Sequence, residues 1–348
     1  MKERVRVLVV DDSAFARSTI SKTLNSDPQI EVVGVARDGI EALEQVKNLK
    51  PSVVTLDVTM PRMDGLAALG RIMAECPTPV VMLSAQTGEQ THATIEALEL
   101  GAVDFFLKPS VISPAGSSDM ASDLLAKVKM AATVSAIRLR PRARSISSMN
   151  RFESRNGRTR VKDKVLVIGA STGGPRALSQ VIPDIPMDIP AAILIVQHMP
   201  AGFTRSLSER LNQASHINVK EAEEGDSLEN GTALLAPGGY HMVVDKSGKI
   251  VLNQDPLVCG VRPSVDVTME SVVKAYGAAT RGVVLTGMGS DGTKGATLIR
   301  NAGGEIVVEH ESTCAVYGMP RSIVESGNAD KIIPLSEVAE EIARMCNS

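Results

Sequence analysis

The 348-residue sequence has no tryptophan, only three tyrosines and only five phenylalanines. So few aromatic side chains argue against binding of RNA or single-stranded DNA by base stacking. The formal net charge of −3 also gives no electrostatic reason to expect a nucleic-acid partner. We therefore expect no nucleic acid among the partners of this protein.

The sequence also lacks paired cysteines and long apolar runs. Its four cysteines lie far apart with no CxxC spacing, unlike a disulfide framework or a zinc site; they are Cys76, Cys259, Cys314 and Cys346. No run approaches the ~18 apolar residues of a membrane-spanning helix, and acids interrupt the first apolar run, unlike a secretory signal. We expect a cytoplasmic protein without membrane insertion, and a monomer is the simplest oligomeric state.

What the sequence does contain predicts two domains and a linker. Residues 1–135 and residues 162–348 each alternate short apolar runs with helical patterns, which is typical of parallel sheets covered by helices. Residues 136–161 are rich in arginine and serine and lack periodicity, which predicts a flexible linker. The predicted fold class is α/β, with a doubly wound parallel sheet followed by a mostly parallel α/β domain.

Polar side chains follow the predicted strands of the first domain. The four strands are Val5–Val10, Val53–Leu56, Pro79–Leu83 and Val103–Leu107, and the side chains at their ends are Asp11, Asp12, Asp57, Ser84 and Lys108. In parallel sheets the carboxyl ends of the strands meet at one edge, where ligands bind. One acid there commonly caps a helix, but three carboxylates suit Mg²⁺, and a hydroxyl with a lysine suits a phosphoryl group.

The second domain opens with the sequence VLVIGASTGGP, residues 165–175. A buried strand is followed by a glycine turn, and Pro175 stands where a helix can begin. The pattern G-x-S-x-G is the nucleophile elbow of hydrolases, and it would hold the Ser171 hydroxyl beside backbone N–H groups able to bind an oxyanion. The same turn is also compatible with plain helix–strand packing or with phosphate binding.

An activated serine needs a base and a group that orients the base. His198 follows the apolar strand at residues 191–196, and Asp291 follows another strand, so both are expected at the edge that carries Ser171. His310 also follows a strand. The residues therefore leave open Ser171–His198–Asp291, which we favour, and Ser171–Asp291–His310, since triads are recognised by geometry. Other candidates are His216 and His241 as bases, and Asp226, Asp245 and Asp266 as acids.

The segments VVDDS, LDVTMPRMDG, PVVMLSA and FFLKP resemble the receiver domain of two-component response regulators over the whole first domain. The resemblance implies a flavodoxin-like fold in which Asp57 accepts a phosphoryl group from a sensor histidine kinase of the chemotaxis type. It also implies a Mg²⁺ site and contacts to the phosphoryl group. The implied ligands of Mg²⁺ are Asp11, Asp12, Asp57 and the backbone carbonyl of Thr59; the implied phosphoryl contacts are Ser84 and Lys108, and Phe105 matches the switch aromatic. Many receivers carry a charged or amide residue where this chain has Thr59.

The segments IGASTGGP, VQHMP, RPSVD, LTGMGSDG and YGMPRS resemble the catalytic domain of chemotaxis protein-glutamate methylesterases, the CheB family. The resemblance implies Ser171 as nucleophile, His198 as base and Asp291 as the acid that orients the base. It also implies an oxyanion pocket near Thr172 and Met288, and no cofactor in this domain. The implied substrates are glutamate γ-methyl esters of chemoreceptors, hydrolysed with release of methanol, and receptor glutamines, which are deamidated; phosphorylation of the receiver is expected to activate the enzyme.

Three other functions compete with this interpretation. A DNA-binding response regulator would need a recognition helix, and no helix-turn-helix pattern is evident. A general esterase or serine protease would explain the serine site but would leave the receiver motifs unexplained. An adaptor that binds receptors without hydrolysing them would share the sequence features and differ only in the geometry of the site.

Overall fold

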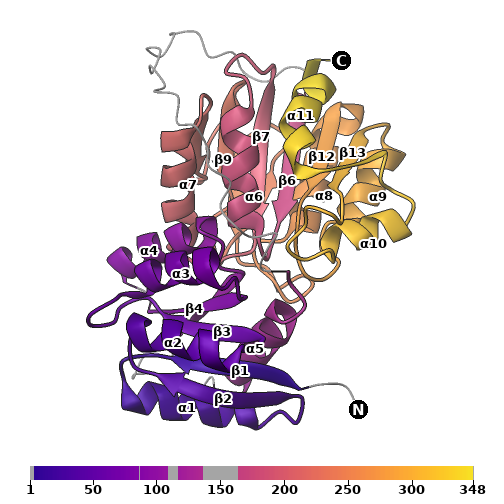
Figure 1. The fold of residues 1–348 in the computed structure, drawn as a ribbon. Coiled ribbons are helices and arrows are strands. Elements are labelled where there is room, and N and C mark those ends of the chain that lie inside the picture. The colour runs from indigo at the N-terminus through magenta and orange to yellow at the C-terminus, as the bar shows by residue number, and fades with distance from the viewer. Residues whose placement is uncertain (1–3, 86, 109–116, 136–163, 348) are drawn as a thin grey trace. The chain divides into compact units, whose positions relative to one another are not determined.

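The computed structural model describes residues 4–85, 87–108, 117–135 and 164–347. The chain divides into two units, Met1–Ala143 and Arg144–Ser348, and each unit has its own parallel sheet (Figure 1). The predicted linker, residues 136–161, lies outside the described residues. Within the described ranges, no helix combines the length and the apolar character needed to cross a membrane.

The first unit alternates strands and helices. Its elements are β1 (Val5–Val10), α1 (Ala14–Asn25), β2 (Ile30–Ala36), α2 (Gly39–Leu49), β3 (Val53–Asp57), α3 (Gly65–Glu75), β4 (Val80–Ser84), α4 (Gly88–Glu99), β5 (Asp104–Leu107) and α5 (Ser117–Ala131). The sheet order is β2-β1-β3-β4-β5 with every pair parallel. This is the flavodoxin-like order, in which the chain winds in both directions from β1.

Helices of the first unit form two packed groups. Helix α1 packs against α5, whereas α2 packs against α3 and α3 against α4. The strands between them are buried on both faces: Val7, Leu8, Val9 and Val10 of β1 have no exposed surface. A sheet covered on both faces needs such continuous apolar strands, so the doubly wound prediction is confirmed.

Strand β2 was not predicted from the sequence. This strand lies at the edge of the sheet, and only its first and last residues, Ile30 and Ala36, are buried. A half-exposed edge strand lacks the continuous buried apolar run on which the prediction relied. The first sheet therefore has five strands instead of the four predicted.

The second unit is built around a larger parallel sheet. Its strands are β6 (Lys164–Ala170), β7 (Ala191–Gln197), β8 (Asn218–Glu221), β9 (Thr232–Leu235), β12 (Thr280–Val284), β13 (Glu305–Glu309) and β14 (Lys331–Ile333), in the order β14-β13-β12-β6-β7-β9-β8. A separate antiparallel hairpin joins β10 (His241–Val244) to β11 (Ile250–Asn253). Strands β8 and β10 were not predicted: three of the four residues of β8 are polar, and β10 begins with the polar residue His241.

The helices of this unit cover its central strands. They are α6 (Gly174–Val181), α7 (Phe203–Ala214), α8 (Val265–Tyr276), α9 (Thr293–Asn301), α10 (Met319–Glu325) and α11 (Val338–Asn347), with short 3₁₀ turns at Ile182–Asp184, Gly277–Ala279 and Leu335–Glu337. Val165 and Val167 of β6 share a core with Met269 and Val272 of α8. The alternate residues of β6 are also fully buried, so β6 has apolar packing on both faces.

Strand β6 is the point from which the second sheet grows in two directions. Its neighbours are β7 on one side and β12 on the other (Figure 1). Loops that follow adjacent strands at such a switch point enclose a crevice at the carboxyl edge of the sheet. The loops after β6, β7 and β12 are those that carry the predicted serine, histidine and aspartate.

Candidate active site

The turn after β6 holds Ser171 at the carboxyl end of the sheet. The backbone N–H of Ser171 donates to the carbonyl of Thr286 at 3.0 Å, and the N–H of Gly174 donates to the carbonyl of Ser171 at 2.8 Å. Gly173 has a φ of +77°, and a Cβ at this position would lie 2.5 Å from the Cβ of Ala315. Glycine is therefore required there, and the turn leads directly from β6 into α6.

His198 lies beside this turn, at the end of β7. Its backbone N–H donates to the carbonyl of Ala170 at 3.1 Å, which ties the ends of β6 and β7 together. Its ring atom Nε2 lies 2.8 Å from Asp291 Oδ2, and both side chains are largely buried. Within the described part of the chain the Ser171 hydroxyl makes no hydrogen bond. Because Nε2 is engaged by Asp291, Nδ1 is the ring atom that remains for the serine.

Asp291 is held as an anion by the first residues of two helices. It accepts five hydrogen bonds, from His198 Nε2 at 2.8 Å, Ser264 Oγ at 2.9 Å, and the backbone N–H groups of Val265 at 2.7 Å, Asp266 at 3.0 Å and Gly292 at 3.1 Å. Burial alone would raise the pKa of Asp291, but the hydrogen bond and charge of His198, with the N–H donors of α8, hold that pKa below its usual value. Helix N-termini stabilise negative charge in this way. The ionised acid can only accept, so Nε2 of His198 carries the proton and Nδ1 is free to act as a base.

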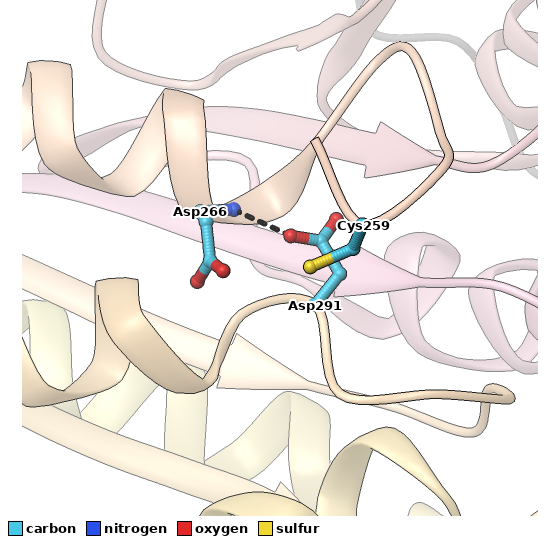
Figure 2. A group of neighbouring side chains, drawn as sticks. All are labelled: Cys259, Asp266 and Asp291. Carbon is cyan, nitrogen blue, oxygen red and sulfur yellow. Dashed lines mark hydrogen bonds between the residues drawn. The ribbon is translucent and has the colours of Figure 1, made fainter. Parts of the chain in front are cut away.

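Cys259 and Asp266 flank this acid (Figure 2). The Cys259 sulfur and one oxygen from each of Asp266 and Asp291 lie within 4.8 Å of one another, a spacing that suits a metal ion. Both oxygens of Asp291 already have donors, however, and Asp266 Oδ1 accepts from the N–H of Gly295 at 2.8 Å. Burial raises the pKa of Asp266 to about 6. A metal ion would have to displace these donors, so we interpret the cluster as the support of Asp291.

A second polar cluster occupies the carboxyl edge of the first sheet. Oxygens of Asp11, Asp12 and Asp57 lie within 4.8 Å of one another, and Lys108 Nζ lies 2.8 Å from both Asp11 Oδ2 and Asp57 Oδ1. Burial raises the pKa of Asp57 to about 6, although Lys108 favours the charged form. Carboxylates facing a lysine can bind a divalent cation together with a phosphoryl group.

Comparisons with known proteins match both units of the chain. The family model described as CheB methylesterase matches residues 166–342, and that of the response regulator receiver domain matches residues 7–113. A protein-glutamate methylesterase/protein-glutamine glutaminase of Symbiobacterium thermophilum is 50% identical over 98% of this chain and 96% of its own length. A protein of the same name from Pyrococcus horikoshii is 46% identical over 99% of this chain and 94% of its own length. This chain belongs to the CheB methylesterase family.

A solved structure gives the same result for the second unit. The crystal structure of the Thermotoga maritima CheB methylesterase catalytic domain is 43% identical, with a TM-score of 0.52. It covers 53% of this chain and 99% of its own length. The second unit of this CheB-family chain therefore has the fold of a methylesterase catalytic domain.

In this family member the acidic cluster of the receiver fits Mg²⁺. The donors are all oxygens, and Asp11, Asp12 and Asp57 bring more negative charge than Lys108 alone can balance. Thr59, whose backbone carbonyl is the fourth predicted ligand, is exposed after β3. Its Oγ1 accepts a hydrogen bond from Gln90 Nε2 of α4 at 3.2 Å.

The other predicted receiver residues lie on the neighbouring strands. Ser84, at the end of β4, is fully buried; its hydroxyl accepts a hydrogen bond from Thr94 at 2.8 Å, and its carbonyl accepts the N–H of Lys108 at 2.8 Å. Phe105 of β5 is buried, and the Lys127 ammonium lies 5.7 Å from its ring centroid. The Ser84 hydroxyl also donates to the carbonyl of Ala85 at 3.2 Å, so it would have to turn from that acceptor to donate to a phosphoryl group.

The alternative triad is not formed. His310 is exposed, and its Nδ1 lies 2.8 Å from Ser312 Oγ. His241 is buried, with Nε2 3.1 Å from the carbonyl of Pro256, and His216 is exposed. Among the described residues, none of these three histidines makes a hydrogen bond to Asp291.

The alternative acids make other contacts. Asp226 pairs with Lys220 at 2.9 Å and accepts the N–H of Glu223. Asp245 accepts the N–H groups of Ser247 and Lys249 and so closes the turn between β10 and β11. Asp226 and Asp245 therefore each stabilise the local structure around them.

Two residues, Thr172 and Met288, were predicted to lie near an oxyanion pocket beside Ser171. A Cβ at Gly287 would lie 2.8 Å from the Ser171 Cβ, so the loop that begins with Gly287 and Met288 packs on the turn that holds Ser171. Met288 is 53% exposed, and its backbone N–H has no acceptor among the described residues. Thr172 is buried, and its carbonyl accepts a hydrogen bond from Thr286 Oγ1 at 3.0 Å. The free N–H of Met288 is suited to bind an oxyanion.

Two residues that support the turn at Ser171, Thr286 and Glu309, were not predicted from the sequence. The N–H of Thr286 donates to Glu309 Oε2 at 2.8 Å, while its carbonyl and hydroxyl hold Ser171 and Thr172. Glu309 has no exposed surface, and burial raises its pKa to about 7. The only signal in the sequence is that Thr286 and Glu309 each lie at the end of an apolar strand.

Proposed function

We propose that this chain is a protein-glutamate methylesterase and protein-glutamine glutaminase in which Ser171 is the nucleophile, His198 the base and Asp291 the orienting acid. The substrates are glutamate γ-methyl esters and glutamines of chemoreceptors, and the enzyme acts in the cytoplasm. The observation that carries the proposal is the 2.8 Å hydrogen bond between His198 Nε2 and Asp291 Oδ2, formed beside the Ser171 turn.

In the first half of the reaction Ser171 Oγ attacks the ester carbonyl, and its proton moves to Nδ1 of His198. The imidazolium that results is stabilised by Asp291, whose lowered pKa keeps it ionised. The N–H of Met288 and the backbone near Thr172 bind the negative oxygen of the tetrahedral intermediate. His198 then returns the proton to the methoxide, and methanol leaves an acyl-enzyme.

In the second half, water loses its proton to His198 and attacks the acyl-enzyme. Collapse of the second tetrahedral intermediate returns the proton to Ser171 and releases a glutamate side chain. A glutamine substrate follows the same steps, except that the group released from the first intermediate is ammonia. One site therefore accounts for both activities.

Phosphorylation of the receiver regulates the activity of the second unit. The Asp57 carboxylate accepts a phosphoryl group from a sensor histidine kinase, and Lys108 contacts that group. Mg²⁺, when bound to Asp11, Asp12, Asp57 and the Thr59 carbonyl, would neutralise the charge that accumulates there. Phosphorylation adds about −1.5 to −2 charges, and this change activates the second unit.

Labelling with a serine-reactive phosphonate tests the nucleophile and its base. We expect one phosphonyl group per chain at Ser171, no labelling of Ser171→Ala, and slow labelling of His198→Gln. Ser247→Ala, which alters an exposed serine of the β10–β11 turn, should label like the wild type. Equal labelling of Ser171→Ala and the wild type would refute the proposal.

A further inference from the structure

The side chain of Gln197 joins the two residues that carry the proposed chemistry. Gln197 is the last residue of β7 and is 1% exposed. Its Nε2 lies 2.9 Å from the carbonyl oxygen of Ser171 and 3.2 Å from that of His198. One amide group therefore bonds to the backbone of both the nucleophile and the base.

The orientation of this amide follows from its surroundings. If the group were turned over, its oxygen would face two carbonyl oxygens, and neither can donate a hydrogen bond. In the observed orientation Oε1 is buried and has no donor among the described residues. The same oxygen lies against the start of α6, where a Cβ on Gly174 would be 1.9 Å from it.

The sheet explains why the amide can reach both carbonyls. Gln197 pairs with Ala170 in the β6–β7 register, so it stands next to the residue that precedes Ser171. The Ser171 carbonyl accepts a second hydrogen bond from the N–H of Gly174 at 2.8 Å. Small residues at positions 170 and 174 leave room for the Gln197 side chain to cross from β7 to the turn.

A buried amide whose oxygen has no hydrogen-bond donor destabilises the folded protein. Leaving a buried acceptor without a donor costs about 1–3 kcal/mol, and an apolar side chain of the same shape would avoid that cost. Such departures from good packing are typical of functional sites. The two hydrogen bonds of the amide fix the distance between the backbones of Ser171 and His198.

We propose that Gln197 is a positioning residue for the reaction, which holds Ser171 and His198 at the spacing needed for proton transfer. This inference rests on the roles proposed above for Ser171 and His198. Reacting groups must meet at about 3–3.5 Å, and a displacement of about 1 Å costs on the order of 100-fold in rate. Loss of the amide therefore lowers kcat and leaves KM nearly unchanged, because no contact with the substrate is removed.

Two nearly isosteric variants, Gln197→Met and Gln197→Glu, test the proposal. Both keep the length of the side chain. Met has no hydrogen-bond donor, and a Glu carboxyl can donate at most one hydrogen bond, when protonated, in place of the two made by the amide. For each we expect kcat and the rate of Ser171 phosphonylation to fall on the order of 10- to 100-fold, with KM within about twofold of the wild-type value. Asn212→Leu is the matched control: it removes an amide that accepts the N–H of Val219 at 3.0 Å, away from the site, and it should keep both rates.

The coupling between substitutions at Gln197 and Gly174, measured on kcat, distinguishes a positioning role from a purely structural one. Gly174→Ala would place a Cβ 1.9 Å from Gln197 Oε1 and 2.8 Å from the Cβ of Ala170. Only the first of these contacts disappears in a Gln197→Ala background, so the loss of kcat caused by Gly174→Ala should be smaller there. Additive effects on kcat would overturn the proposal. So would a wild-type kcat in both isosteric variants, or a loss of activity that merely follows the fraction of unfolded protein. If Ser171→Ala itself stays active, the proposed nucleophile is wrong; if it is inactive while the Gln197 variants keep their rates, only the positioning role is wrong.

Discussion

Substitution of Glu309 by glutamine should change how the stability of the catalytic unit depends on pH. Glu309 has no exposed surface, and burial raises its pKa from the ordinary value of 4.5 to about 7. Between these two values the unfolded chain has lost the proton and the folded chain has kept it. Raising the pH through this window therefore favours unfolding.

The magnitude follows from the two pKa values. At about 1.4 kcal/mol per pKa unit, the wild-type free energy of unfolding should lose about 3 kcal/mol through Glu309 between pH 4 and pH 8. Glu309→Gln cannot ionise, and its amide oxygen can still accept the N–H of Thr286. The variant should therefore gain about 3 kcal/mol relative to the wild type over this range and keep its esterase activity.

Urea denaturation at pH 4, 6 and 8, followed through the transition of the catalytic unit, measures this difference. Glu311→Gln, which removes an exposed carboxylate two residues away, serves as the control and should run parallel to the wild type. If Glu309→Gln also runs parallel to the wild type at all three pH values, the buried carboxylate does not titrate as argued.

Further predictions concern the acid of the triad and the receiver. Asp291→Asn should lower kcat for methanol release on the order of 10³- to 10⁴-fold. The single Asn oxygen would face the three donors that now bind Oδ1, so its NH₂ group would face Nε2 of His198 and favour the tautomer protonated on Nδ1; a loss of less than tenfold would contradict the role proposed for Asp291. Gly65→Ala would place a Cβ 2.0 Å from the carbonyl oxygen of Asp57, so the receiver should lose about 1–3 kcal/mol of stability in urea. Gly70→Ala in the same helix, where a Cβ meets no atom within 4 Å, should instead gain about 0.5–1 kcal/mol; equal effects of the two substitutions would contradict the packing argument.

The fold was predictable where strands are long and buried. The apolar runs of β1 and β6 indicate parallel sheets: β1 lies between β2 and β3 in the first sheet, and β6 is the central strand of the second. The edge strands β2 and β8 were not predicted because most of their residues are only partly buried, so neither strand has a continuous buried apolar run. Boundaries and edges depend on what packs against a strand, which a single sequence does not contain.

The candidate site was predictable where its residues directly follow buried strands. Parallel strands bring their carboxyl ends together, so His198 and Asp291 could be placed near Ser171 from their positions after strands. The supporting residues could not be found in this way. Gln197 bonds to a residue 26 positions earlier in the chain, and Glu309 to one 23 positions earlier, and such contacts leave no local pattern in the sequence.

Methanol release from membranes that carry methylated chemoreceptors tests the central claim most directly. The assay compares wild type, Ser171→Ala and Asp57→Asn, each with and without a small phosphodonor and Mg²⁺. The account predicts release that rises with the phosphodonor in the wild type, a basal rate that does not rise in Asp57→Asn, and a loss on the order of 10⁶-fold in Ser171→Ala. Substantial release by Ser171→Ala would contradict the assignment of the nucleophile, and a rise in Asp57→Asn equal to that of the wild type would contradict the assignment of the phosphorylated residue.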